Sequence, residues 1–460
     1  MSERQNAEQT LFRQKLELLV LTQDETVLSH VREVISEHKL TFRFFHEGNV
    51  DLPQEAAEIK KPAVILICQK EDEDLQAFST HIDTLLKDFP KSAIITVLRD
   101  SSLSEDLKGT ENSRVYPLSQ HELLNTAKFE TIMLTKSRSQ FFTILPTDLF
   151  PMTSIDFTAY VQLSLNQRYL AVLFKRLVLT EDRLQRISRA KGLLIPITES
   201  EGYHNYIASY YDTSGASLKK RARSLFYALS ANWMILFDYL ALDYKTLPEA
   251  QVEETFAKIQ STIKEIIELF SKEEDLWETF KEASNNPIFS LWRSPWIAIY
   301  SALIAVKSGQ GNPEDSLLAG LFSDIGLISL KSELLQKYLT SELKDLTPEE
   351  KTQIEKYPIE SLNRCLLKKL PLSENVKSII ATSNERFDGT GFPNQVPADK
   401  IPTEAYLIHF AMLIDLASRT SMKELGVGFR FTREKLWEAQ KQNTGNFAPD
   451  FLEKIANALL

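Results

Sequence analysis

Short apolar runs alternate with amphipathic segments in the first third of the chain. Residues 16–22, 62–68 and 92–98 are LELLVLT, PAVILIC and SAIITVL. Continuous apolar runs of this length are typical of strands that are buried on both faces of a parallel sheet. Helix-like segments lie between them at 26–38 and 78–89. The alternation predicts a doubly wound α/β domain over 15–135, preceded by a tail at 1–14.

The pattern changes twice further along the chain. Apolar residues recur near period two over 156–180, which predicts a β-hairpin. A short helix that begins at 181 and ends before Gly192, and a strand over 193–197, should follow, so we expect a small α/β domain over 136–215. From about residue 216 the period becomes helical, and we expect an all-α domain over 216–460.

One predicted helix carries a heptad-like apolar stripe over 252–270. Its members alternate spacings of four and three residues: Val252, Phe256, Ile259, Ile263, Ile266 and Phe270. The stripe is expected either to pack on its own domain or to form the seam of a homodimer.

Composition and charge exclude several classes of protein. The chain has 460 residues, 43% of them hydrophobic and 25% charged, which is typical of a globular protein. With 53 Lys and Arg against 63 Asp and Glu, the net charge is −10, which disfavours general nucleic-acid binding. The two cysteines, Cys68 and Cys365, cannot form a Cys-based zinc site. The N-terminus has no apolar signal core and no apolar run is long enough to span a membrane, so we expect a cytoplasmic protein. No Gly-rich phosphate loop occurs, and no cofactor is expected.

The N-terminal segment resembles a response-regulator receiver domain in length and element order. In that family an Asp ends the third strand and accepts a phosphoryl group. Here that strand ends in Cys68, Gln69 and Lys70. The resemblance therefore implies a receiver-like fold without phosphotransfer chemistry.

Four motifs in the last third of the chain carry the candidate chemistry. They are LFSDIGL at 321–327, LTPEE at 346–350 followed by Tyr357 and Pro358, SNERFDGTGFP at 383–393, and IP at 401–402 followed by Met412 and Asp415. In order and spacing they resemble the motifs of the HD-GYP family, metal-dependent phosphohydrolases that cleave cyclic di-GMP. The resemblance covers roughly 216–425.

The chain departs from the family pattern at the metal-ligand positions. The resemblance places these ligands at Arg293, Ser323, Asp324, Tyr357, Ser383, Asn384 and Met412, where only Asp324 keeps the family residue. Leu327 replaces a phosphate-handling Lys. After His204 the chain has one further histidine, His409. Ser, Asn, Tyr and Met are poor ligands for manganese or magnesium. The resemblance thus implies a degenerate site with no metal and no catalytic residue, in which Arg293 pairs with Asp324 or with a phosphate.

Two groups of residues are candidates for binding. The loop Asp388, Gly389, Thr390, Gly391, Phe392 and Pro393 keeps the family pattern except for Phe in place of Tyr. In the family this loop is thought to contact GGDEF domains, so we expect either a partner-binding loop or a structural turn. The candidate nucleotide contacts are Arg293, Arg386, Trp292 and Trp296, the two tryptophans being alternatively core residues.

These observations lead to three hypotheses. The first is a catalytically inactive HD-GYP-like scaffold of bacterial cyclic di-GMP signalling, which acts through protein contacts, with a GGDEF-domain protein as one candidate partner. The second is a metal-free receptor that binds cyclic di-GMP without hydrolysing it. The third is a phosphodiesterase with an unusual metal set.

Overall fold

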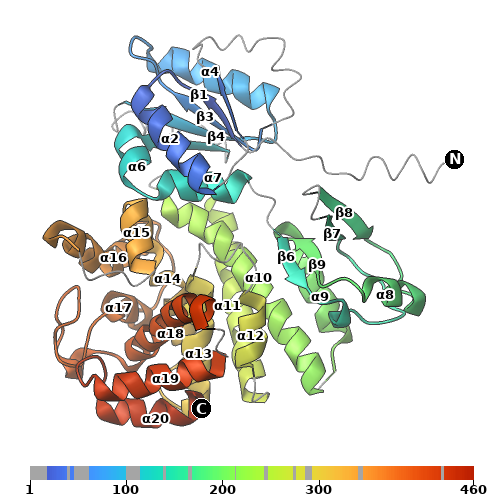
Figure 1. Cartoon of the computed structure of the whole chain (residues 1–460), viewed down its shortest axis with the longest axis vertical. Coiled ribbons are helices and arrows are strands. Elements are labelled where there is room, and N and C mark those ends of the chain that lie inside the picture. The colour runs from blue at the N-terminus through green and yellow to red at the C-terminus, as the bar shows by residue number, and fades with distance from the viewer. Residues whose placement is uncertain are drawn as a thin grey trace. The chain divides into compact units, whose positions relative to one another are not determined.

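Figure 1 shows the computed structural model of the chain. The described residues are 18–38, 42–45, 62–99, 114–137, 141–163, 168–212, 214–242, 247–272, 276–284, 293–339, 346–425 and 429–459. They divide into two compact units. The first holds the described parts of Met1–Gln140, Tyr160–Val172 and Leu242–Pro248, and the second those of Phe141–Ala159, Leu173–Ala241 and Glu249–Leu460. The boundaries predicted at residues 14, 135 and 215 stay a prediction.

A five-stranded parallel sheet forms the centre of the first unit, in the order β2-β1-β3-β4-β5. Its strands are β1 (Leu18–Leu21), β2 (Phe42–Phe45), β3 (Val64–Cys68), β4 (Ala93–Leu98) and β5 (Val115–Ser119). Its helices are α2 (Glu25–His38), α4 (Leu75–Asp88), α6 (Gln120–Asn125) and α7 (Lys128–Ser137). The predicted α/β fold of this region is confirmed. The strand β2 was not predicted.

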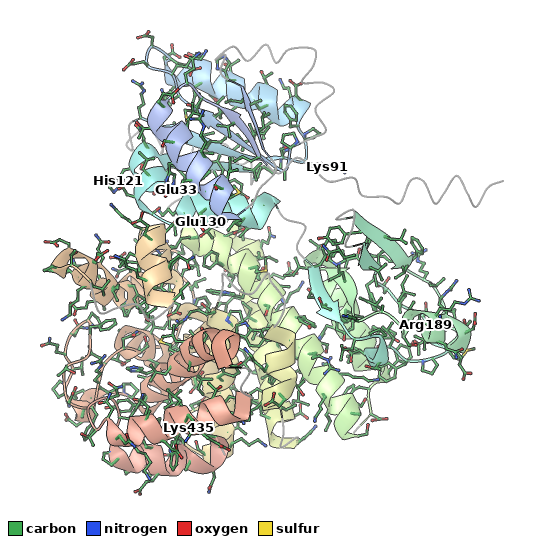
Figure 2. All side chains as sticks on the ribbon, viewed as in Figure 1. Glu33, Lys91, His121, Glu130, Arg189 and Lys435 are labelled. Carbon is green, nitrogen blue, oxygen red and sulfur yellow. The ribbon has the colours of Figure 1, made fainter. Side chains whose placement is uncertain are left out.

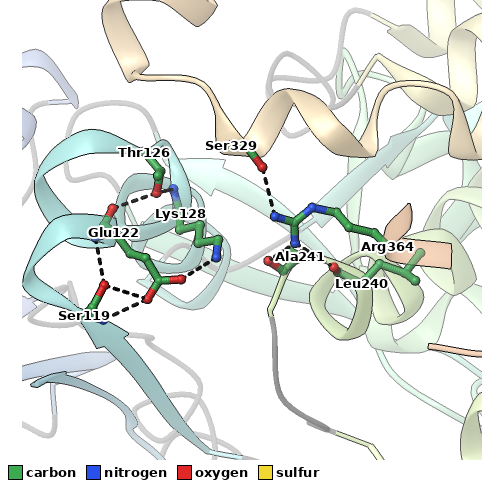
Figure 3. Close-up of polar contacts among 8 residues, drawn as sticks. All are labelled: Ser119, Glu122, Thr126, Lys128, Leu240, Ala241, Ser329 and Arg364. Carbon is green, nitrogen blue, oxygen red and sulfur yellow. Dashed lines mark hydrogen bonds and ion pairs between the residues drawn. The ribbon is translucent and has the colours of Figure 1, made fainter. Parts of the chain in front are cut away.

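Burial and capping explain why these segments form these elements. Leu19, Ile65 and Ile94, from three neighbouring strands, are buried against Phe78 and Ile82 of α4. At the start of α6, Ser119 and Glu122 form a capping box, in which each side chain accepts the other residue's backbone N–H. Figure 3 shows this cap together with the ion pair between Glu122 and Lys128. The Lys128 Nζ lies 2.5 Å from the Glu122 Oε1.

A second, smaller sheet has the strand order β6-β9-β7-β8. Its strands are β6 (Phe141–Ile144), β7 (Ala159–Leu163), β8 (Arg168–Leu173) and β9 (Leu193–Pro196), with the short helices η2 (Pro146–Asp148), α8 (Glu181–Ile187), η3 (Ile197–Glu199) and α9 (Ser200–Tyr210) nearby in sequence. The predicted hairpin strands, short helix and following strand are confirmed.

From α10 onward the described part of the second unit is helical, as predicted. Its elements are α10 (Gly215–Ala241), α11 (Glu249–Lys272), α12 (Trp277–Ser284), α13 (Ser294–Ser308), α14 (Pro313–Phe322), η5 (Ile325–Ser329), α15 (Ser332–Leu339), α16 (Pro348–Leu367), α17 (Glu374–Thr382), η6 (Ala398–Lys400), α18 (Thr403–Leu425), α19 (Phe429–Gln442) and α20 (Pro449–Leu459). The apolar helix α13 is buried over 294–305 and packs against α14 and α18. Within the described residues, no helix has the length and apolar character that crossing a bilayer requires.

The apolar stripe of α11 packs inside its own unit. Its six members are all buried, and α11 contacts α10, α13 and α14. The stripe therefore has no free face for a second copy of the chain. The predicted dimer seam is not formed by these residues, and the alternative of packing on the chain's own domain is the one observed.

Candidate functional site

The positions matched to metal ligands come from five segments of the second unit. Arg293 immediately precedes α13, whose first turn is set by Pro295. Asp324 lies in the turn between α14 and η5. Tyr357 lies on α16, Ser383 and Asn384 follow α17, and Met412 lies on α18. All are buried, with exposed fractions from 0% to 6%.

Arg293 forms a buried ion pair where the resemblance places metals. Its Nε lies 2.6 Å from Oδ2 of Asp324 and 3.8 Å from Oδ2 of Asp415. Burial alone would lower the pKa of Arg293, but the nearby carboxylates, Asp324 first, outweigh burial and raise it. Burial raises the pKa of Asp324, and the Arg293 charge opposes that rise. The contact is close but not well directed, since no guanidinium nitrogen of Arg293 makes a well-directed hydrogen bond to a described residue.

Contacts through Tyr338 and Tyr357 connect this pair with Asn384 and Met412. The Tyr338 ring lies beneath the Arg293 guanidinium, 5.5 Å from ring centroid to Cζ. Its hydroxyl lies 3.0 Å from that of Tyr357. Asn384 donates from Nδ2 to the Tyr357 hydroxyl at 2.8 Å, and Met412 Sδ lies 3.9 Å from the same oxygen. Burial raises the pKa of both tyrosines, so both are neutral donors and acceptors near neutral pH.

The hydroxyls at the other matched positions bond to nearby backbone. Ser323 donates to the Gly320 carbonyl at 3.1 Å, and Ser383 to the Ile380 carbonyl at 3.0 Å. Leu327 lies in an apolar cluster with Leu330 and Tyr357 among others. These side chains complete the interior of the helical unit.

Ser361 and Gly326 are structural residues that sequence reasoning missed. The Ser361 hydroxyl accepts from the Gly326 N–H at 2.8 Å and lies 2.7 Å from the Ser323 carbonyl oxygen. A Cβ on Gly326 would lie 2.2 Å from the Tyr357 carbonyl oxygen, so only glycine fits. Ser361 belongs to no motif. Gly326 belongs to LFSDIGL, and its place in that motif is the one signal the sequence offered.

The loop over 388–393 is held by its own polar contacts. Asp388 Oδ1 accepts from the Thr390 N–H at 2.9 Å and from its hydroxyl at 2.6 Å, and these bonds lower the pKa of Asp388. Gly389 has φ of 72°. A Cβ on Gly391 would lie 2.3 Å from the backbone nitrogen of Arg386, so a larger residue does not fit at this position.

Only part of this loop faces solvent. Asp388 and Thr390 are exposed, whereas Gly391 is buried. Phe392 is half-buried and packs on Tyr357, with ring centroids 6.2 Å apart. Glu385 fixes the loop from inside, since its carboxylate accepts the Asn394 and Val396 N–H groups at 2.8 and 3.1 Å. Sequence reasoning gave Glu385 no role.

The candidate nucleotide contacts are not brought together as a stacking surface. Trp296 is 2% exposed, and its ring packs on Phe226 with centroids 3.9 Å apart. The prediction that Trp296 stacks on a base is therefore wrong, and its alternative as a core residue is correct. Trp292 lies outside the described residues. Arg386 is half-buried, near His409.

The residues of this site do not fit a divalent metal. Within the described parts of the chain, no three His, Cys, Asp or Glu side chains gather closely enough to hold an ion. The guanidinium of Arg293 lies against Asp324, the one matched position that keeps a ligand residue. The neighbouring Ser, Asn and Met side chains are neutral and suit neither magnesium nor manganese.

A comparison with protein families matches part of this helical region. Residues 282–425 match the family model described as HD domain, which supports the HD superfamily for this region. The chain is similar to the 3'3'-cGAMP-specific phosphodiesterase 2 of Vibrio cholerae serotype O1, with 27% identity over 163 residues, or 35% of this chain. The match spans 29% of that relative's length. Among solved structures, Bd1817, a HDG"Y"P protein from Bdellovibrio bacteriovorus, aligns with 70% of this chain and 99% of its own, at 20% identity and a TM-score of 0.45.

Proposed function

We propose that the chain is a catalytically inactive HD-GYP-like scaffold of bacterial cyclic di-GMP signalling, which acts through protein contacts. The observation that carries this proposal is the buried pair of Arg293 and Asp324. The pair puts a fixed positive charge where the resemblance places metals. Hydrolysis of a phosphodiester by such a site needs a metal-activated water and a cation on the phosphate oxygens. A divalent cation beside a buried guanidinium would be strongly repelled.

The proposed output is the exposed part of the loop over 388–393 together with the receiver-like region. Phe387, Asp388 and Thr390 face solvent next to backbone that is held by the Gly445 and Asn446 carbonyls. An exposed ring on a rigid turn suits protein contact. The receiver-like region would dock without phosphotransfer, because β3 ends in Cys68 and not in the Asp that accepts a phosphoryl group. Burial raises the pKa of the Cys68 thiol to about 12, so this side chain is not a reactive thiolate either.

The metal-free receptor remains the second candidate because of one observation. The guanidinium of Arg293 is fully buried and lacks a well-directed acceptor among the described residues, and a phosphate oxygen would supply one. The low exposure of its neighbours argues against entry of a dinucleotide, since Ser323, Ser383 and Tyr357 are no more than 1% exposed.

The test is a calorimetric titration of cyclic di-GMP and of 3'3'-cGAMP into the full-length chain, together with a product assay in manganese and a metal analysis. The scaffold proposal expects no bound transition metal, no product and no heat. Micromolar binding without product, weakened in Arg293→Lys, would replace it with the receptor. A stoichiometric metal with product would establish the enzyme and refute both.

A further inference from the structure

An isolated β-bridge joins the segment before β7 to the segment after β8, and apolar side chains around it are exposed to solvent. Ser154 and Val178 form an antiparallel bridge, and the Met152 N–H donates to the Leu179 carbonyl at 2.7 Å. Met152 lies in the turn that leads into this bridge, with φ of 60°, and Val178 lies in the bridge itself. They are 69% and 48% exposed. Phe174, which accepts the Leu177 N–H in the adjoining turn, is also 48% exposed.

The opposite face of this pair is already the core side. Ile155 and Leu179 alternate with the exposed residues and are buried. A half-exposed strand pair normally carries polar side chains on its solvent face. In the next element, α8, Leu184 and Ile187 are half-buried. Met152, Phe174 and Val178 are therefore the side chains that leave apolar groups in water.

The same segment is strongly basic within an acidic chain. Residues 173–192 contain six Lys and Arg against two acidic residues, a net charge of +4, whereas the whole chain carries −10. Arg186 is paired with Asp182 at 2.7 Å. Arg176, Arg189 and Lys191 are exposed and have no acidic partner among the described residues. Figure 2 labels Arg189, just beyond α8.

We propose that the exposed residues of these segments, Met152, Phe174, Arg176, Val178, Arg189 and Lys191, together called the basic apolar face, bind the surface of an anionic lipid bilayer. Cations attract the headgroups and the exposed apolar side chains enter the interface. Binding to a fluid bilayer requires positive charge and apolar side chains that can enter the interface, but it does not require a surface of matching shape. That requirement is met by cations in the turns before and after α8. The inference does not depend on the inactivity of the HD-type region.

The test is co-flotation of the full-length chain with vesicles of phosphatidylcholine alone or with about a third phosphatidylglycerol. We expect binding to the anionic vesicles only, which weakens as salt is raised. The triple variant Arg176→Glu, Arg189→Glu, Lys191→Glu should bind at least roughly tenfold more weakly. Met152→Ser with Phe174→Ser should also reduce binding, with unchanged circular dichroism.

A matched control reverses three exposed lysines elsewhere, Lys435, Lys441 and Lys454. This control should bind as the wild type does. An equal loss in both triple variants would mean that net charge alone matters, and would overturn the proposal. Absence of wild-type binding would also overturn it. A polyglutamate peptide run in parallel identifies the alternative, because binding to the peptide and not to vesicles would make the face a site for acidic proteins.

Discussion

The Nε atom of Arg293 lies 2.6 Å from Oδ2 of Asp324, and both side chains are 3% exposed. The two residues are brought together by the turns that begin α13 and η5. A buried charge is costly unless it is paired. The arginine therefore compensates the charge of the one acidic ligand position that the motif retains.

Replacing Arg293 should strongly destabilise the fold. Arg293→Met removes the cation that lies beside the buried Asp324, and we expect a loss of about 3–5 kcal/mol in the free energy of unfolding. Urea unfolding followed by circular dichroism measures this. The double variant Arg293→Met, Asp324→Asn should recover part of the loss. A single variant as stable as the wild type would show that the pair does not compensate a buried charge.

Much of the fold was predictable because burial and local chemistry leave marks in the sequence. The runs at 62–68 and 92–98 became β3 and β4, since a strand covered on both faces must be apolar throughout. The capping box at Thr347 and Glu350 also formed as the S/T-x-x-E pattern indicates. The four residues of β2 were missed because so short a run lacks a clear period.

The site was predictable only in part, because contacts between distant segments leave no spacing signal. The Arg293–Asp324 pair was one of two alternatives expected from the motif match. The role of Tyr338, whose hydroxyl meets Tyr357, carried no signal beyond an amphipathic helix. For Trp296 and the stripe of α11 the sequence left two alternatives open, core packing being one of them, since an apolar face predicts burial and not what covers it.

Gly326 should tolerate no larger residue. In Gly326→Ala the new Cβ would lie 2.2 Å from the Tyr357 carbonyl oxygen and 2.8 Å from the Ser361 nitrogen, both backbone atoms. We expect a loss of about 3 kcal/mol. The control is Gly389→Ala, where no atom lies within 4 Å and the positive φ should cost only about 1 kcal/mol. Equal losses in a thermal unfolding assay would contradict the proposed close packing.

Arg364 should stabilise the end of α10. Figure 3 shows its Nη1 donating to the carbonyls of Leu240 and Ala241, at 3.2 and 2.9 Å, and its Nη2 to Ser329 at 2.9 Å. These carbonyls belong to the last turn, which lacks helical donors. Arg364→Ala should cost about 2 kcal/mol, and Arg364→Lys roughly half of that. Denaturant unfolding checks this, with the exposed Arg189→Ala expected to change nothing.

His409 should make the fold sensitive to mild acid. Its side chain is buried and contacts the Glu385 carbonyl and the Phe447 ring, and burial, followed by the Arg386 charge, lowers its pKa from 6.5 to about 4. Between these two pKa values the unfolded chain binds a proton at His409 and the folded chain does not. The contribution of His409 to the free energy of unfolding is therefore fully present above pH 6.5 and is lost as the pH falls toward 4. Between pH 7 and pH 5 the wild type should lose about 2 kcal/mol of its free energy of unfolding because of His409. The His409→Gln variant should lose about 2 kcal/mol less of its free energy of unfolding over the same interval, while His204 contributes to both proteins alike.

The matched control is His121→Gln at an exposed position labelled in Figure 2. This variant should keep the wild-type difference in the free energy of unfolding between the two pH values. An unchanged difference in His409→Gln would show that His409 is protonated within the fold.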